Sequence, residues 1–399
     1  MKLGIEKILE NSSLRRPLHG KRIALLGHPA SVTQSMQHSL DALCACPELD
    51  MRCAMGPQHG MRGDKQDNMV ESEDFVDPRH GIPVFSLYGH TRRPTDAMMD
   101  GFDVLLCDVQ DIGCRIYTYI TTLLYVLQAC AQSQKVVWVL DRPNPAGRAM
   151  EGSILKSGWT SFVGAGPILM RHGLTMAEMA KWFIRQADLQ VDLTVVPMDG
   201  YDPHAGPGFG WPEGMAWVNP SPNASSVNMA RIFAGSVLFE GTQLSEGRGT
   251  TNALELVGAP DIDMDQLLRD MHKLAPHWMQ GALLRACYFE PTFHKHQGTL
   301  CRGFQVHTDV NRYDPKAFKP YRLMALLLKA LRLRYPDYEL WRKHAYEYEF
   351  DRLPIDLIDG GPALREWVDD SEGKVGDFDE QLVADEFAWG LDVRESLIY

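Results

Sequence analysis

The sequence has no apolar run long enough to cross a membrane, a span that takes about 18–20 consecutive residues. Its first stretch, MKLGIEKILENSSLRRPLHG, mixes apolar residues with charges and contains no signal-peptide core. Basic residues are also few: 40 Lys and Arg stand against 52 Asp and Glu, a formal net charge of −12. Because nucleic acids and anionic membranes select basic surfaces, we expect neither as a partner. We expect a cytoplasmic protein.

Metal-binding and redox spacings are absent as well. The eight cysteines are scattered and form no CxxC pair, a pattern typical of free thiols in a reducing compartment. No EF-hand and no HExxH spacing occurs. His294 and His296 have the spacing of a metal-binding pair, but they lack a nearby third ligand and are interpreted as surface residues. We therefore predict no bound metal.

The common cofactor and nucleophile signatures are missing too. The turn after the first apolar run, Gly27–Ser31 (GHPAS), lacks the GxGxxG pattern that lets a backbone approach a pyrophosphate. No GxxxxGK[ST] loop and no GxSxG elbow occurs anywhere in the chain. Nicotinamide, nucleotide and serine-hydrolase interpretations are therefore disfavoured, and we expect no cofactor.

What the first 200 residues do contain is an alternation of short apolar runs with amphipathic segments. The apolar runs, predicted to be strands, are Lys21–Gly27, Arg52–Met55, Pro83–Tyr88, Asp103–Asp108, Val136–Asp141 and Val191–Pro197. The predicted helices between them are Gln34–Leu43, Arg115–Gln132 and Thr175–Gln186. Near-continuous apolar strands separated by helices are typical of an α/β fold whose parallel sheet is covered on both faces.

The composition changes after Pro197. A segment dense in Gly, Pro and Trp, Asp199–Pro222, has the character of a long ordered loop. Helical patterns then occur at Met264–Leu274 and Tyr321–Leu333, with a strand-like piece at Phe304–Thr308. A chain of 399 residues exceeds what one small core usually occupies, so this part is predicted to form a second, α+β domain.

Polar residues gather where the predicted strands end. In parallel sheets, ligands bind beyond the carboxyl ends of the strands, so these residues are predicted to surround one site. They are His28 after the first strand; Gln58, His59 and Arg62 after the second; Asp108, Gln110, Asp111 and Arg115 after the Asp103 run; and Asp141, Arg142 and Asn144 after the Val136 run. His59 and Asp108 are candidate catalytic groups among them.

Two later segments add polar groups. Trp217–Asn223 (WVNPSPN) is rigid and suited to presenting the amides of Asn219 and Asn223 to hydroxyl groups. Glu240–Thr251 (EGTQLSEGRGTT) alternates glycines with carboxylates, hydroxyls and an arginine. In this loop Arg248 could pair with an anionic group while a glutamate transfers a proton. A tight interdomain turn is the alternative interpretation.

Together these segments resemble one family, the NamZ-type exo-β-N-acetylmuramidases of glycoside hydrolase family 171, long catalogued as a domain of unknown function. The resemblance rests on GPQHGMRG, GIPVFSLYG, RPT, DVQDIGCRIYTYITTL, VLDRPNPAG, Glu151-Gly152, SFVG, MRHGLT, WVNPSPN, EGTQLSEGRGTT and FEPTFHKHQGTLCRG, in family order. It implies a Rossmann-like domain (residues 1–200) that carries most of the site, and a smaller α+β domain (201–399) that closes the cleft.

The resemblance also implies a substrate, a terminal N-acetylmuramic acid on a peptidoglycan fragment. The lactyl carboxylate of this sugar would suit Arg142, Arg171 or Arg248, within a site that the MRHGLT motif extends to His172. Its hydroxyl and acetamido groups would suit Asn144, Asn219 and Asn223.

One departure from the family pattern concerns the acid. Many relatives have Pro-Glu-His-Gly where this chain has Pro57-Gln58-His59-Gly60, and an amide cannot titrate. Glu246 is the first candidate to replace that glutamate, because its glycine-rich loop can approach a substrate closely. Glu71 and Glu73 follow, because they are near Gln58 in sequence.

Three hypotheses follow for the function. The first is a glycoside hydrolase of the muramidase type in peptidoglycan recycling, acting on a small amino-sugar or muropeptide. The second is a binding protein that lost hydrolysis with Gln58. The third is a metal-assisted hydrolase that uses Asp108, Asp111 and His59. A homo-oligomer remains open, and the stereochemical outcome cannot be read from the sequence.

Overall fold

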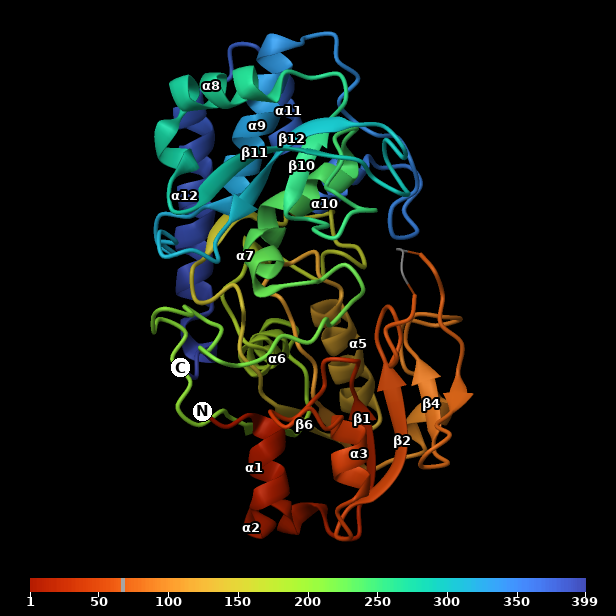
Figure 1. Cartoon of the computed structure of the whole chain (residues 1–399). Coiled ribbons are helices and arrows are strands. Elements are labelled where there is room, and N and C mark those ends of the chain that lie inside the picture. Colours follow the sequence, from red (N-terminus) through yellow and green to blue (C-terminus); the bar gives the residue numbers. More distant parts are fainter. Residues whose placement is uncertain (66–68) are drawn as a thin grey trace.

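The computed structural model describes residues 1–65 and 69–399, and its largest feature is a seven-stranded sheet (Figure 1). Its strands are β1 (Arg22–Leu26), β2 (Asp50–Gly56), β3 (Phe75–Val76), β4 (Pro83–Ser86), β5 (Val104–Cys107), β6 (Val136–Leu140) and β9 (Leu193–Val196). They lie in the order β3-β4-β2-β1-β5-β6-β9, and all neighbours are parallel except the edge strand β3. The six parallel strands follow the 3-2-1-4-5-6 order of the Rossmann fold, so the Rossmann-like prediction is confirmed.

The sheet is apolar on both faces because helices cover both. Within β1, Ile23 and Leu25 pack into one core with helices α1 (Gly4–Glu10) and α3 (Ser39–Cys44). Ala24 and Leu26 face the other core, which contains α5 (Tyr119–Gln132) and α6 (Met176–Gln186). Alternate residues of a strand point to opposite faces, so a strand buried on both sides has no polar position. The short helices α2 (Ser12–Arg15) and α4 (Asp96–Met99) complete this half.

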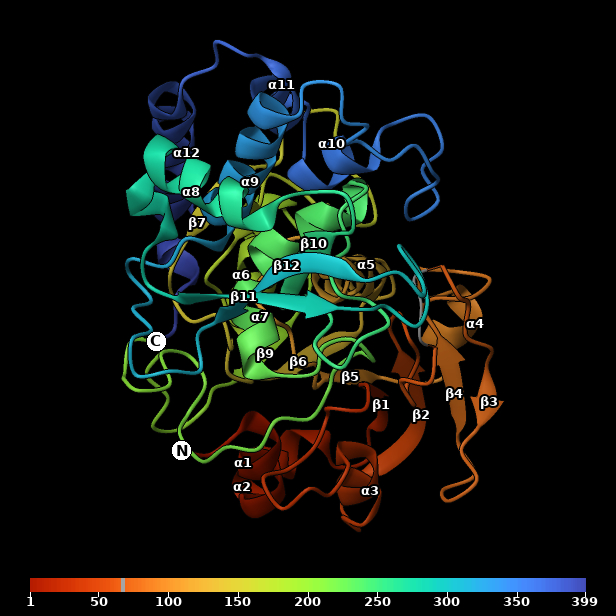
Figure 2. The same cartoon turned by 45° about the horizontal axis from the view of Figure 1, so that its top comes forward.

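The second half is built on a three-stranded antiparallel sheet in the order β10-β12-β11. Its strands are β10 (Leu256–Ala259), β11 (Leu283–Phe289) and β12 (Cys301–His307), and helix α9 (Pro320–Arg334) lies above them in the view of Figure 2. The other helices are α7 (Val227–Ser236), α8 (Met264–Leu274), α10 (Pro354–Asp359), α11 (Ala363–Asp369) and α12 (Val375–Asp392). The prediction of a second, smaller α+β part is therefore confirmed.

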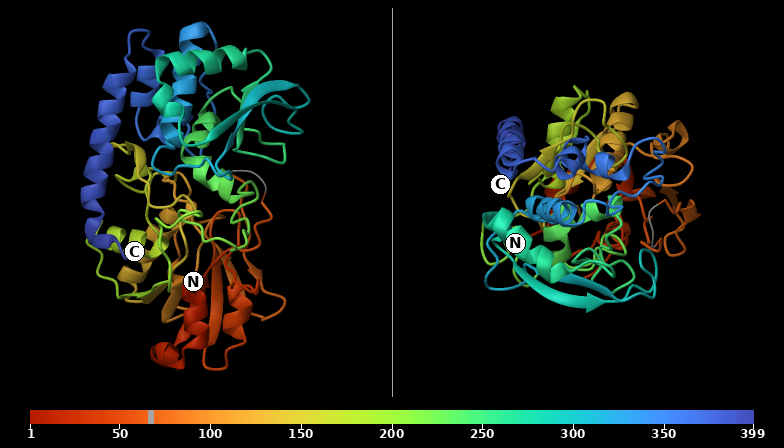
Figure 3. Two further views of the ribbon diagram at one scale, coloured as in Figure 1. Left: turned by 60° about the vertical axis from the view of Figure 1, so that its left-hand side comes forward. Right: turned by 90° about the horizontal axis from the view of Figure 1, so that it is seen from above.

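The two halves are joined by buried charges and by the last helix. A hairpin of β7 (Glu151–Ile154) and β8 (Leu169–Arg171) packs against α12, the long helix at the side of the molecule (Figure 3). Arg115, just after β5, donates to the carbonyls of Ser153 (2.7 Å) and Ile168 (2.8 Å) in the hairpin region. The same guanidinium donates to Ile358 (3.0 Å) and Asp359 (2.6 Å) of α10. Arg115 is thus a structural clamp.

Two further features bear on the sequence expectations. All eight cysteines are free thiols, and burial raises the pKa of seven of them, Cys44, Cys53, Cys107, Cys114, Cys130, Cys287 and Cys301. Among residues 1–65 and 69–399, no helix combines the length and the apolar character that a membrane span requires.

Candidate active site

A pocket lies where the carboxyl ends of β2 and β5 meet loops of the second half of the chain. The first half contributes Gln58 and His59, which follow β2, and the segment Ile116–Tyr119, which follows β5 and leads into α5. The second half contributes Ser221, Asn223, Glu240, Arg248, Leu254, Tyr346 and Glu347, among others. The position matches the expected one, because ligands of Rossmann-type sheets bind beyond the carboxyl ends of the strands.

Glu347 is held in this pocket by two side chains of the first half, and a third holds one of those two. Its Oε1 accepts a hydrogen bond of 3.0 Å from Nε2 of Gln58, and its Oε2 accepts one of 2.7 Å from the Tyr88 hydroxyl. The Thr118 hydroxyl donates to Oε1 of Gln58 at 2.6 Å, which turns the NH₂ group of that amide toward Glu347. Gln58 therefore positions a carboxyl group although it has none itself.

The surroundings of Glu347 favour its protonated form. Its side chain is only 5% exposed, and this burial raises the pKa above the ordinary value. The hydrogen bonds from Tyr88 and Gln58 act in the opposite direction, while the nearby Glu240 carboxylate raises the pKa further. A buried carboxylic acid whose pKa is raised can serve as a proton donor near neutral pH.

Glu240 is the second carboxylate of the pocket. Its Oε1 accepts a hydrogen bond of 2.5 Å from Arg248, and its Oε2 accepts one of 2.7 Å from the Tyr346 hydroxyl. Arg248 and Tyr346 line the same pocket. The pocket therefore combines an acid biased toward protonation with a carboxylate whose charge a guanidinium compensates.

Glu246, the first-ranked candidate acid, is in a different environment. It is fully buried, 2.5 Å from Nζ of Lys295 and 3.0 Å from Nε of Arg248. Burial alone would raise its pKa, but Lys295, Arg248 and His294 outweigh that effect and lower it to about 2. A carboxylate held ionised in this way has no proton to donate at neutral pH. We therefore transfer the proposed acid role from Glu246 to Glu347.

Most of the polar strand-end residues form hydrogen bonds with one another or with backbone groups, and they do not line the pocket. Asp108, proposed as catalytic, accepts hydrogen bonds from Arg142 at 2.6 and 2.9 Å and another from Ser39. The ring of His28 accepts a hydrogen bond from the backbone N–H of Gln110 and stacks on Tyr119. Neither Arg142 nor Asp108 is thus available to a substrate in the pocket.

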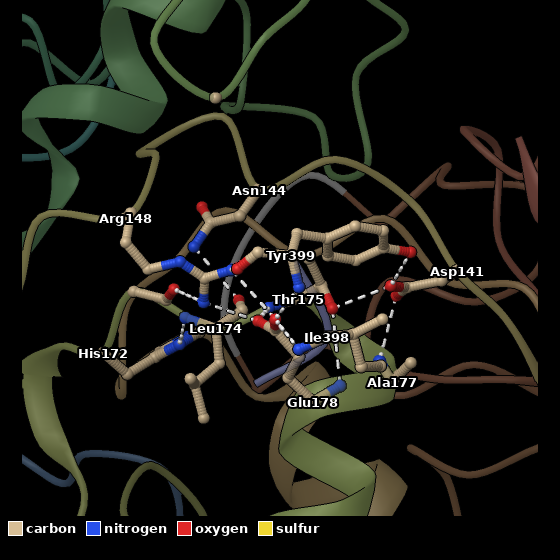
Figure 4. Close-up of polar contacts among 12 residues, drawn as sticks. Asp141, Asn144, Arg148, His172, Leu174, Thr175, Ala177, Glu178, Ile398 and Tyr399 are labelled. Atoms are coloured by element: carbon tan, nitrogen blue, oxygen red, sulfur yellow. Dashed lines mark hydrogen bonds and ion pairs between the residues drawn. The ribbon is translucent and has the colours of Figure 1, made fainter. Parts of the chain in front are cut away.

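The same holds for the strand-end residues near α6 (Figure 4). Asp141 accepts hydrogen bonds from Thr175, from the backbone of Ala177 and from Tyr399, so it fixes the start of the helix and residue 399. The remaining buried members bind backbone groups or one another: Asn144 to Leu174 and Ala146, Gln110 to Asp111 and Pro143, His172 to Asp111, and Arg171 to Phe318 and Ala146.

Other predicted residues lie toward the surface. Arg62 stacks on the Phe75 ring at 4.0 Å, and with Glu71 and Glu73 it lines a separate surface hollow. Asn219 is exposed. Of the predicted site residues, the structure brings Gln58, His59, Asn223 and Arg248 together around the pocket.

The residues with the clearest chemical character were missed by sequence reasoning or left without a role. Glu240 opens the EGTQLSEGRGTT segment, and that position is the signal that could have identified it. Glu347 lies in AYEYEF, which has no glycine, no motif and no neighbouring strand end. Its contact with Gln58 spans 289 residues of sequence.

The metal-site hypothesis finds no support in this geometry. Asp108 is engaged by Arg142 and Ser39, and Asp111 by His172 and the backbone of Gly113. Across the two described ranges, no three His, Cys, Asp or Glu side chains form a group that could hold a metal ion.

Comparison with known proteins agrees with the fold. The family model described as exo-beta-N-acetylmuramidase NamZ, N-terminal, matches residues 23–228, and its C-terminal counterpart matches residues 231–399. The peptidoglycan beta-N-acetylmuramidase NamZ of Bacillus subtilis (strain 168) is 38% identical over 342 residues, 84% of this chain and 78% of that protein.

Two crystal structures of DUF1343 family proteins from Bacteroides fragilis have the same fold. One is 27% identical with a TM-score of 0.82, and the other is 25% identical with a TM-score of 0.74. Each alignment covers 100% of this chain and 98% of the other. Both family models and the Bacillus relative thus lead to one conclusion: the chain belongs to the NamZ family of exo-β-N-acetylmuramidases.

Proposed function

We propose that this protein is a glycoside hydrolase that releases terminal N-acetylmuramic acid from peptidoglycan fragments. Family membership supports this proposal, as does the 38% identity to a protein described as a peptidoglycan beta-N-acetylmuramidase. The observation that carries it is the pair of carboxyl groups, Glu347 and Glu240, in one pocket. Hydrolysis of a glycosidic bond uses such a pair, one group as the acid and the other as a carboxylate.

In this mechanism Glu347 is the general acid. Its proton passes to the glycosidic oxygen while the bond from that oxygen to the anomeric carbon breaks. Glu240 is the second carboxylate and stabilises the positive charge that develops on the sugar ring. A water molecule then supplies the hydroxyl group of the released sugar, and its remaining proton restores the acid.

Gln58 takes the role of a positioning residue. Where many relatives have a glutamate, its amide donates to Oε1 of Glu347 and is itself fixed by Thr118. The acid is thus supplied at position 347 from the second half of the chain, within hydrogen-bond distance of Gln58. This arrangement favours hydrolysis over the binding-protein hypothesis, because the pocket retains an acid.

We propose further that the enzyme acts in the cytoplasm on fragments already released, as in peptidoglycan recycling. The eight free thiols are typical of a reducing compartment.

An activity screen tests the proposal. Chromogenic β-glycosides of N-acetylmuramic acid and N-acetylglucosamine are incubated with the protein, and the expected result is release of the chromophore from the first. If the protein binds N-acetylmuramic acid in calorimetry and leaves both glycosides intact, the binding-protein hypothesis replaces this one.

A further inference from the structure

A second cavity adjoins the active-site pocket and shares four residues with it: Glu240, Arg248, Tyr346 and Glu347. Beyond these, the second cavity is lined by Met69, His294, Arg342, His344 and Ala345. Among the lining residues that the structure describes, the acidic ones are the two shared glutamates. A group attached to a sugar in the first pocket can therefore extend into a space whose additional polar side chains are all basic.

The basic groups around this cavity differ in the partners that hold them. Arg248 is paired with Glu240 and Glu246, and Lys295 is paired with Glu246. Arg342 differs: within residues 1–65 and 69–399 its guanidinium makes no ion pair and no hydrogen bond, while its backbone N–H is fixed by the Gly241 carbonyl at 3.0 Å. Arg342 is therefore a basic group of the cavity whose guanidinium is not committed to another group of the described ranges.

The imidazole of His344 lies close to the positive charges of Arg342 and Lys295. Its Nδ1 is buried and has no hydrogen-bond partner in the described parts of the chain. Burial lowers the pKa of His344, and Arg342 and Lys295 lower it further, to about 4. The ring is therefore neutral at pH 7 and can donate an N–H to an anion without bringing a charge of its own.

We propose that this second cavity is the subsite for the carboxylate of the substrate's lactyl group, with Arg342 as its principal ligand. The assignment rests on the proposed function, which supplies a sugar bearing that group. A guanidinium suits a carboxylate because its planar fork can donate two parallel hydrogen bonds. Arg142 and Arg171 are occupied by buried partners, and Arg248 is committed to two glutamates.

Binding measurements test the subsite without requiring hydrolysis. Calorimetry compares N-acetylmuramic acid, its methyl ester and N-acetylglucosamine on the wild type, on Arg342→Met and on Lys343→Met. Lys343 is the matched control, because it is exposed on the same loop and its replacement removes the same charge. We expect Arg342→Met to weaken N-acetylmuramic acid about tenfold or more. The ester, the uncharged sugar and the control should change little.

Two outcomes would overturn the subsite. One is a wild type that binds the acid and its ester equally; the other is an Arg342→Met variant that loses all three ligands together or none. These outcomes are distinct from failure of the proposed function. A protein that hydrolyses no muramoyl glycoside yet needs Arg342 for the free acid would retain the subsite and lose the enzymatic role. An active enzyme whose KM does not change in Arg342→Met would retain the enzymatic role and lose the subsite.

Discussion

Gln58 and Glu347 lie 289 residues apart in sequence, and Nε2 of the first donates a hydrogen bond of 3.0 Å to Oε1 of the second. One belongs to the loop after β2 and the other to a loop of the second half. The proposed acid is therefore complete only when both halves are in place. Its proton affinity depends on burial and on hydrogen bonds from Tyr88 and Gln58 of the first half.

Glu347→Gln should lower turnover by about 10²–10⁴-fold, the usual contribution of general acid catalysis. The amide is nearly isosteric and can still contact Tyr88, so substrate binding should change less than kcat. Glu349→Gln is the control, because Glu349 lies two residues away and pairs with Arg352 outside the pocket. Comparable kcat values for Glu347→Gln and the wild type would remove Glu347 from the mechanism.

The pH profile should have an alkaline limb that Glu347 sets. The acid works when protonated, so activity falls as the pH rises through its raised pKa. In Gln58→Glu a second carboxyl group would lie within hydrogen-bond reach, and the pair would hold one proton to higher pH. The alkaline limb of kcat/KM should therefore move upward. A limb at the wild-type position would show that Gln58 does not contact the titrating group.

Glu246→Gln should lower the free energy of unfolding rather than turnover. It leaves Lys295 buried without its counter-charge, a loss of about 3–5 kcal/mol in the free energy of unfolding. The double variant Glu246→Gln/Lys295→Met should regain part of that loss, since it removes the unpaired charge. Denaturant unfolding measures both. A stable Glu246→Gln protein with turnover reduced a hundredfold would instead restore Glu246 as the acid.

The stability that Glu246 contributes should depend on pH in a definite direction. Its pKa falls from the ordinary 4.5 to about 2 on folding, so the contribution is present above pH 4.5 and is lost as the pH falls toward 2. Between pH 4.5 and pH 2, the free energy of unfolding of Glu246→Gln should therefore fall less, from its value at pH 7, than that of the wild type falls.

Asp141 should show the opposite dependence. Burial raises its pKa from 3.8 to about 7, despite the three hydrogen bonds that it accepts. Its contribution is fully present below pH 3.8 and is lost as the pH rises toward 7. Asp141→Asn should flatten the stability profile between these values in thermal unfolding at a series of pH values. An unchanged slope would mean that Asp141 ionises in the folded protein as readily as in the unfolded chain.

The sequence was sufficient for the buried strands of the first half and for strongly amphipathic helices, and insufficient for side-chain partners and for the short elements of the second half. Helix α8 has the predicted bounds, Met264–Leu274, because an amphipathic period is a local property. Helix α5 begins at Tyr119 rather than Arg115, since the intervening turn carries Arg115 to the hairpin and Thr118 to Gln58.

The site differs from its prediction for a related reason. Polar residues at strand ends can bind a ligand or one another, and a single sequence does not distinguish the two. Asp108 and Arg142 have the residue types of a site and form a buried pair instead. Glu347 carries no local signal at all, because only the tertiary fold brings its loop to Gln58.

The Arg115 clamp has an evolutionary consequence. One guanidinium from the loop after β5 satisfies carbonyls of the hairpin region and of α10 together, so each half carries polar groups that only the other completes. The halves therefore cannot be exchanged freely between distant relatives. A recombinant that inherits Arg115 without a matching end of α10 would bury a guanidinium whose N–H groups lack hydrogen-bond acceptors. Selection on the two halves is coupled at this point, through a residue that does not itself line the active-site pocket.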